Sequence, residues 1–233
     1  MEVPNIDSKL VEGLLHNLKP SKSPGPDGIH PRVLKKLAPP LAIIFRSSVS
    51  TGSIPQSWKT ANITPIFKKE DKREPSNYCP VSLTCIVSRV LERIIRDNLS
   101  DHFRRNNLIS DKQFGFLSGW STTIQLIQVV EDWTKYLDCG NAIDVVYMDF
   151  MKAFDKVSHS HLIQKLTCLG VDVHSLHTVN CLHNFLTGRT QMVKYQNTIS
   201  SRKSVISGVP QGDSKRSSCI FVFYKRFTWW SCF

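Results

Sequence analysis

The stretch YMDFMKAFDKVSH, residues 147–159, decides how this chain is interpreted. It follows an apolar run, Ile143 to Tyr147, that predicts a buried β-strand and places Asp149 near the end of that strand. Because an unpaired carboxylate in such a place is costly, Asp149 is expected to meet a cation or hydrogen-bond donors. One interpretation is a metal ion, and the other is a cap on the following turn or a pair with Lys152. The segment alone favours the two equally.

The residues on either side predict helices mixed with short strands. Helices are predicted over residues 7–18, 32–50 with an interruption at Pro39 and Pro40, 83–103, 122–137, 162–169 and 174–187. Strands are predicted over residues 61–67, 143–147, 190–196 and 203–207. The segment 20–31, rich in proline and glycine, predicts a rigid turn after the first helix. This mixed order predicts an α+β fold.

The charge balance indicates which class of molecule the chain would bind. Lys and Arg number 30 against 19 Asp and Glu, which gives a net charge of +11 and favours nucleic acid, ahead of an anionic membrane surface. No apolar run approaches the roughly 20 residues of a membrane-spanning helix, and the N-terminus does not resemble a secretion signal. The seven cysteines form no C-x-x-C pair, so neither a disulfide framework nor a zinc ribbon is indicated. A nuclear or cytoplasmic protein is expected, with no membrane contact and no secretion.

The segment YMDFMKAFDKVSHSHLIQKL, residues 147–166, resembles the strand-turn-helix motif that carries the first catalytic aspartate in reverse transcriptases of jockey-like non-LTR retrotransposons. Six further segments match in the expected order: SPGPDGIHP (23–31), PIFKKEDKREPSNYCPVSLT (65–84), SRVLERIIRDNL (88–99), QFGFLSGWSTTIQLI (113–127), FLTGRTQMV (185–193) and SGVPQG (207–212). The resemblance extends from about Ile6 to Gly212. It implies the fingers and an incomplete palm of a right-hand polymerase.

The family resemblance implies an RNA-directed DNA polymerase that uses magnesium. Asp149 would bind the catalytic Mg²⁺ ions, with help from the backbone carbonyl of Phe150. The partners would be an RNA template, a DNA primer and deoxynucleotides. The same resemblance implies three parts: residues 1–140 would be rich in fingers elements, residues 141–212 would form a partial palm, and residues 213–233 would be a divergent tail whose composition suits a shifted reading frame.

The resemblance also assigns nucleotide contacts. The positions are Phe150, Lys152, Ala153, Phe154, Gln211 and Gly212. Phe154 matches the bulky residue that crowds the sugar 2′ position and so favours deoxynucleotides. Gln211 lies in the loop 208–212, which would contact the nascent base pair. The residues themselves leave alternatives open, because Phe154 suits a plain core aromatic and the loop suits an ordinary turn.

Departures from the family pattern predict a weakened enzyme. Cys79, Leu117 and Trp120 stand at or near positions where the family has basic residues that hold phosphate, and each lost contact would remove about 1.5 to 3 kcal/mol. Asp213 is the only carboxylate after Gly212, so the Tyr-Ala-Asp-Asp type motif that completes the metal site is not recognisable. The expectation is a truncated chain without polymerase activity of its own.

A second hypothesis needs no catalysis. The chain would be a basic remnant that binds RNA or DNA through exposed cations. The residues assigned to this contact are Lys68, Lys69, Arg73, Arg93 and Arg96. Charge runs of this kind more often form solvated faces, so the sequence leaves this hypothesis open.

Overall fold

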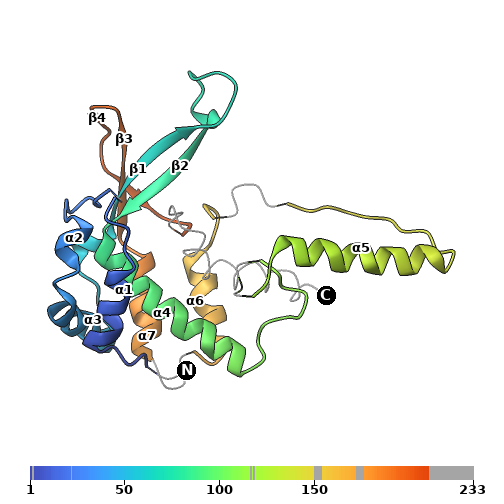
Figure 1. The fold of residues 1–233 in the computed structure, drawn as a ribbon. Helices are drawn as coiled ribbons and strands as arrows, with labels where there is room; N and C mark the ends of the chain where they lie inside the picture. Colours follow the sequence, from blue (N-terminus) through green and yellow to red (C-terminus); the bar gives the residue numbers. More distant parts are fainter. Residues whose placement is uncertain are drawn as a thin grey trace.

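A computed structural model describes residues 1, 3–21, 23–115, 117, 119–149, 154–171 and 176–209. Over these ranges a helical body carries a small mixed sheet, and one long helix extends away from both (Figure 1). The predicted residues Phe150, Lys152 and Ala153 lie outside the described ranges, as do Gln211 and Gly212. The segment 213–233 lies outside them too.

The elements follow the predicted mixture of helices and strands, which confirms the α+β class. The helices are α1 (Ser8–His16), α2 (Pro31–Leu34), α3 (Ala38–Thr51), α4 (Ile86–Arg105), α5 (Thr122–Asp138), α6 (His159–Cys168) and α7 (Leu176–Leu186), with short 3-10 turns at Gln56–Lys59 and Pro75–Asn77. The strands are β1 (Thr60–Phe67), β2 (Tyr78–Thr84), β3 (Arg189–Tyr195), β4 (Thr198–Ile199) and β5 (Lys203–Val205).

The helix ends have local causes. Asp7 caps α1, because its Oδ1 accepts a hydrogen bond from the Leu10 amide at 2.7 Å. The helix predicted over residues 32–50 is interrupted at residues 35–37, between α2 and α3, whereas Pro39 and Pro40, where the interruption was predicted, lie in the first turn of α3. Amide groups have no helical partner in a first turn, so proline is tolerated there. Helix α3 ends at Gly52, which adopts the left-handed conformation (φ 66°).

The sheet has the order β2-β1-β3-β4, and β5 pairs with β3. Strands β1 and β2 form an antiparallel hairpin with Ala61 opposite Thr84 and Phe67 opposite Tyr78. Strand β3 runs parallel to β1, while β4 and β5 pair with β3 in antiparallel register. The hairpin therefore projects from the body, with its connecting loop at the end far from α4 (Figure 1).

The core lies between the helices below the sheet. Helix α1 packs against α3, α3 against α7, and α6 against α7. Helix α4 contributes the longest buried stripe, which includes Leu91, Leu99 and Phe103 at 1% exposure or less. The charged residues of α4 lie mainly on the other face, as the three-and-four spacing of its apolar residues predicts.

The predicted strand over residues 143–147 is wrong. This segment is irregular and returns along α5, with Val146 and Tyr147 79% and 85% exposed (Figure 1). Within the described ranges no strand pairs with it, and a backbone without partners for its N–H and C=O groups forms no sheet. Asp149 therefore follows an exposed extended segment, and the buried strand end predicted for it is not found.

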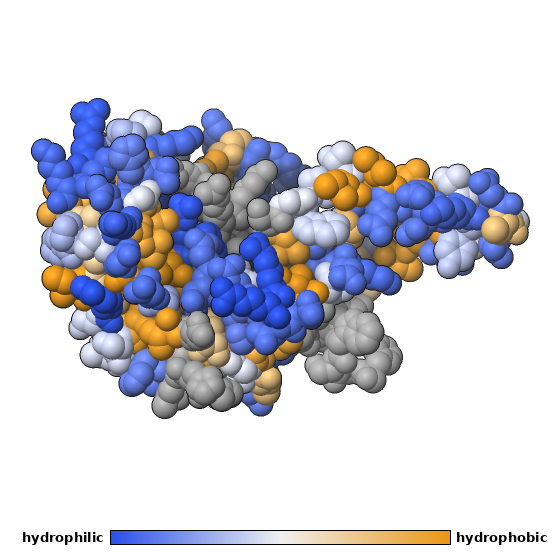
Figure 2. All heavy atoms as spheres, turned by 60° about the horizontal axis from the view of Figure 1, so that its bottom comes forward, coloured by the Kyte–Doolittle hydropathy of each residue, from blue (hydrophilic) through white to orange (hydrophobic). Residues whose placement is uncertain are grey.

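Helix α5 forms where predicted but buries none of its residues. Its apolar side chains, among them Leu126, Val130 and Leu137 at 56–64% exposure, lie at the surface of this helix, which extends away from the body (Figure 2). The helix is held locally by the Ser121 cap and by an ion pair between Lys135 and Glu131 at 2.7 Å. Its periodicity predicts the helix, but not where its apolar face would pack.

A buried cation lies beneath the sheet at the start of β3. Arg189 is 3% exposed, and its Nη1 donates a hydrogen bond to the Phe185 carbonyl at 3.2 Å. Its guanidinium lies 4.9 Å from the Phe185 ring centroid. On α4, burial raises the pKa of Glu92 to about 7, although Arg189, Arg96 and Arg89 act to lower it. The protonation of Glu92 is therefore coupled to folding.

Replacement of this carboxyl, Glu92→Gln, should remove part of the pH dependence of stability. The folded-state pKa of about 7 lies above the ordinary value of 4.5, so the folded chain holds the proton more tightly than the unfolded chain. Stability from Glu92 is present below pH 4.5 and is lost as the pH rises toward 7. Urea unfolding across that window should show a decline on the order of 1 to 3 kcal/mol in the wild type and a smaller one in Glu92→Gln. Equal declines in the two proteins would contradict a raised pKa.

Candidate functional site

The loop 206–209 docks on the turn that precedes α6. The amide of Gly208 donates to the Val157 carbonyl at 2.8 Å, and the amide of Val209 donates to the Phe154 carbonyl at 3.0 Å. The hydroxyl of Ser207 donates to the Asp155 carbonyl at 2.9 Å. These bonds bring together the segment that follows Asp149 and the segment SGVPQG, which lie about 50 residues apart in the sequence.

Glycine at position 208 is required by this docking. Its φ is +84°, a conformation that residues with a side chain rarely adopt. A Cβ atom there would lie 2.8 Å from the Phe154 carbonyl oxygen and 2.9 Å from the Asp155 Cα. Because both obstacles are backbone atoms, no side-chain rotation can relieve the overlap. The close approach of the two segments therefore depends on Gly208.

A pocket of about 440 Å³ opens between this loop and the sheet. Its lining is largely uncharged: Ala61, Ile63, Pro80, Ser82, Thr190, Gln191, Val193, Ser204, Val205, Ile206, Ser207, Gly208 and Val209, with Asp155 and Arg189 as the charged members. Strands β1, β2, β3 and β5 form the sheet side. Hydroxyl and amide groups of this kind can orient a polar ligand by hydrogen bonds.

Asp149 is exposed in the segment that leads toward this turn. In the described part of the chain, no group of three or more His, Cys, Asp or Glu side chains is arranged to hold a metal ion. A magnesium site in a protein needs oxygen ligands at octahedral positions, and one carboxylate supplies one or two of them. The described residues therefore do not form the predicted metal site, and the metal-binding roles of Asp149 and Phe150 stay predictions.

Phe154 is the one nucleotide-contact position within the described ranges. It is half-buried and packs against the hydrophobic core, and its carbonyl accepts the Val209 amide. This packing favours the core-aromatic alternative that the sequence left open. Contact between its ring and a sugar stays a prediction.

The predicted nucleic-acid contacts Lys68, Lys69 and Arg73 lie on the loop of the β1–β2 hairpin and are exposed. The loop is ordered by its own hydrogen bonds: Asp71 accepts from the Arg73 amide at 2.9 Å, and the Tyr78 hydroxyl donates to the Lys72 carbonyl at 2.9 Å. Lys69 forms an exposed ion pair with Glu70 at 3.3 Å, which is worth little in water. The hairpin therefore presents its cations to solvent.

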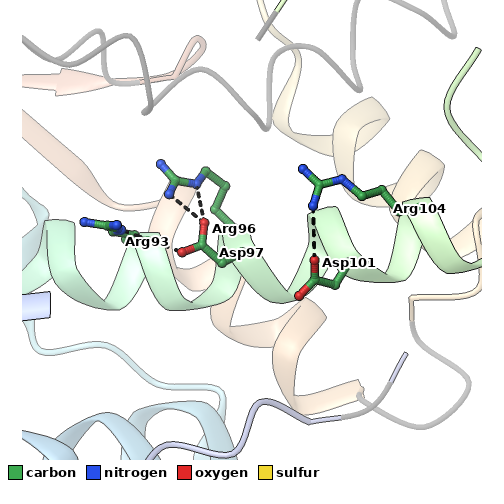
Figure 3. A network of polar contacts seen from close by, with 5 residues as sticks. All are labelled: Arg93, Arg96, Asp97, Asp101 and Arg104. Atoms are coloured by element: carbon green, nitrogen blue, oxygen red, sulfur yellow. Dashed lines mark hydrogen bonds and ion pairs between the residues drawn. The ribbon is translucent and has the colours of Figure 1, made fainter. Parts of the chain in front are cut away.

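Arg93 and Arg96, the other two predicted contacts, lie on α4 and share the carboxylate of Asp97 (Figure 3). The Nη2 of Arg96 lies 2.6 Å from Oδ1, and the Nε of Arg93 lies 3.7 Å from Oδ2. The Arg96 side chain is only 12% exposed. These two arginines are separated from the hairpin loop by the length of β2, so the five predicted cations do not form one surface.

The positions that depart from the family pattern lie in two separate parts of the chain. Cys79 is half-buried in β2, while Leu117 and Trp120, between α4 and α5, line a separate pocket of about 240 Å³ at the C-terminal end of α4. Trp120 stacks edge-on against Phe114 with ring centroids 5.0 Å apart. None of the three supplies a positive charge.

Sequence reasoning missed the residues that join the two site segments. Ser207 and His159 contact backbone across the junction, and the strand residues Ser82 and Gln191 line the pocket. The matched segment 207–212 includes Ser207, and the matched segment 147–166 includes His159, so both residues were visible in matched segments. The pocket residues carry no signal of their own, because only strand pairing brings them together.

A family model described as reverse transcriptase (RNA-dependent DNA polymerase) matches residues 67–225, more than half of the chain. The chain belongs to the reverse transcriptase family. This confirms the resemblance and the polymerase-like fold class. The matched range ends inside the segment 213–233 that composition sets apart.

The curated relatives come from insect mobile elements. The chain is 32% identical to a probable RNA-directed DNA polymerase from transposon BS and 32% identical to one from transposon X-element, both of Drosophila melanogaster, over 88% and 82% of this chain. It is 31% identical over 87% of its length to the RNA-directed DNA polymerase from mobile element jockey of the same species. It spans about a fifth of the length of these relatives (21–22%). No described helix is long and apolar enough to cross a membrane.

Proposed function

We propose that this chain is the fingers and the first part of the palm of an RNA-directed DNA polymerase. The observation that carries the proposal is the docking of loop 206–209 on the turn 154–158, since these are the two segments to which the family resemblance assigns the nucleotide. The proposed boundaries are residues 1–140 for the fingers-rich part, 141–212 for the partial palm and 213–233 for a divergent tail. The location would be nuclear or cytoplasmic.

The proposed substrates are deoxynucleotides, an RNA template and a DNA primer. Each is polyanionic, in keeping with the net charge of +11. The pocket of about 440 Å³ lies beside the docked loop, and its hydroxyl and amide groups would orient the incoming base and sugar. Phe150, Lys152, Ala153, Gln211 and Gly212 keep their proposed nucleotide contacts.

The proposed metal is Mg²⁺, with Asp149 as one carboxylate ligand. Reverse transcriptases use a divalent metal ion, but the described residues contain no group of three or more His, Cys, Asp or Glu side chains that could hold one. The remaining ligands would have to come from residues outside the described ranges. Because the Tyr-Ala-Asp-Asp type motif that would supply them is not recognisable in the sequence, we propose that the 233-residue chain by itself does not extend a primer.

Primer extension on poly(rA)/oligo(dT) with Mg²⁺ tests this proposal. The wild-type chain and Asp149→Asn should both give no product above the protein-free control, because one carboxylate leaves most of the transition-state charge unneutralised. Filter binding of the same primer–template at low salt should show that both proteins bind it equally. Primer extension by the wild type that disappears in Asp149→Asn would contradict the proposal that the chain is inactive. Absence of primer–template binding by a folded chain would contradict the proposal that it binds nucleic acid.

A non-catalytic nucleic-acid-binding role is the second candidate. The observation that favours it is the exposed set of cations on the hairpin loop, which needs neither a metal nor a completed palm. Arg93 and Arg96 contribute less to it, because both pair with Asp97.

A further inference from the structure

Helix α6 begins at a histidine that reaches the docked loop. The Nε2 atom of His159 lies 2.7 Å from the carbonyl oxygen of Gly208, and the contact is partly buried. A carbonyl oxygen only accepts hydrogen bonds, so Nε2 carries the proton and donates it. This side chain comes from the segment after Asp149, whereas Ser207, which also bonds across the junction, comes from the loop.

The bond acts on one particular peptide group. The Gly208 amide is held by the Val157 carbonyl, and the Gly208 carbonyl is held by His159. Without the imidazole, the peptide between residues 208 and 209 would be held only through its N–H, which the Val209 amide donates to the Phe154 carbonyl. With it, both polar groups of this peptide, the Gly208 C=O and the Val209 N–H, have a fixed partner, and its orientation about the glycine ψ angle is set.

We propose that His159 is a positioning residue, which orients the peptide 208–209 and thereby the part of the 440 Å³ pocket that Gly208 and Val209 line. The nucleotide half of this inference rests on the proposed function. The structural half rests on the hydrogen bonds alone, so the two can be tested separately.

Three substitutions test it in the full chain. His159→Phe keeps a flat ring but removes the donor, and His159→Gln restores an N–H group near the Nε2 position. His161→Phe is the matched control, because it makes the same change two residues later at an exposed position of the same helix. Urea unfolding midpoints identify any variant that is merely unstable.

Amide hydrogen exchange at Gly208 and Val209 measures directly how firmly the loop is held, since these amides donate to the carbonyls of Val157 and Phe154. Exchange should be about 5-fold faster in His159→Phe, the effect of one lost hydrogen bond, and should return to the wild-type rate in His159→Gln. The amides of α4 and the control variant should be unchanged. Equal exchange in wild type and His159→Phe, or no recovery in His159→Gln, would overturn the inference.

Equilibrium binding of dTTP in the presence of poly(rA)/oligo(dT) and Mg²⁺ tests whether His159 affects nucleotide binding, which is the nucleotide half of the inference. The affinity should fall about 5-fold or more in His159→Phe and recover in His159→Gln. Equal affinities in all variants would overturn this half. No dTTP binding by the wild type would overturn it together with the nucleotide part of the proposed function, while the exchange rates would still decide whether His159 holds the loop.

Discussion

A methyl group added at Gly25 is expected to prevent the chain from folding stably. In the segment SPGPDG, a Cβ atom at this position would lie 2.5 Å from the Cys85 Cα and 2.7 Å from the Thr84 carbonyl oxygen. Both atoms belong to the backbone junction where β2 ends and α4 begins, and Cys85 also caps α4. Neither can rotate away, so Gly25→Ala should cost at least about 3 kcal/mol, the upper end of the usual range for overpacking.

Urea unfolding followed by circular dichroism measures this effect. The control is Gly13→Ala, in the middle of α1, where no described atom lies within 4 Å of the added Cβ apart from the adjacent residues and the backbone of the helix itself. That variant should be more stable than the wild type by about 0.5 to 1 kcal/mol, because alanine loses less backbone entropy in a helix. An unfolding midpoint of Gly25→Ala equal to that of the wild type would show that the loop can move off the junction.

Charge reversal on the hairpin loop should abolish most binding to a single-stranded oligonucleotide. The triple variant replaces Lys68, Lys69 and Arg73 by Glu, at positions that are exposed and lie outside the helical core. Each cation that contacts a phosphate adds about 0.7 to the slope of log affinity against log salt, so the slope should fall by about 2. At low salt the affinity should fall by about 100-fold or more.

The control for net charge replaces Lys9, Lys19 and Lys36 by Glu, which are equally exposed but lie near α1 and α2. This variant has the same change in net charge, so its affinity should fall only slightly and its salt slope should be unchanged. Fluorescence anisotropy of a labelled oligonucleotide over a series of salt concentrations gives both quantities. Equal losses in the two variants would show that binding follows net charge and that the hairpin is no specific surface.

The helices of this chain follow closely from the sequence. The apolar spacing of α4 and α5, the Asp7 and Ser121 caps and the glycine at the end of α3 all predict elements that the structure contains. These signals are local, since a helix satisfies its hydrogen bonds within its own segment.

The strands follow less well. Strand β2 was missed, because Pro80 argues against a strand and Leu83 continues the apolar pattern of α4. Its place at the sheet edge explains why proline is tolerated there. Residues 143–147 have the composition of a strand and form none, since no described segment pairs with them.

For the candidate site, the sequence by itself determined the family and the two segments, with Asp149 in one and Gly208 in the other. It could not tell that Phe154 packs on the core, that Arg93 and Arg96 share Asp97, or that His159 holds the Gly208 carbonyl. Only the tertiary structure decided these contacts. The physical reason is that a helix is specified by neighbours three and four residues away, whereas strand pairing, burial and loop docking depend on groups brought together from distant parts of the chain.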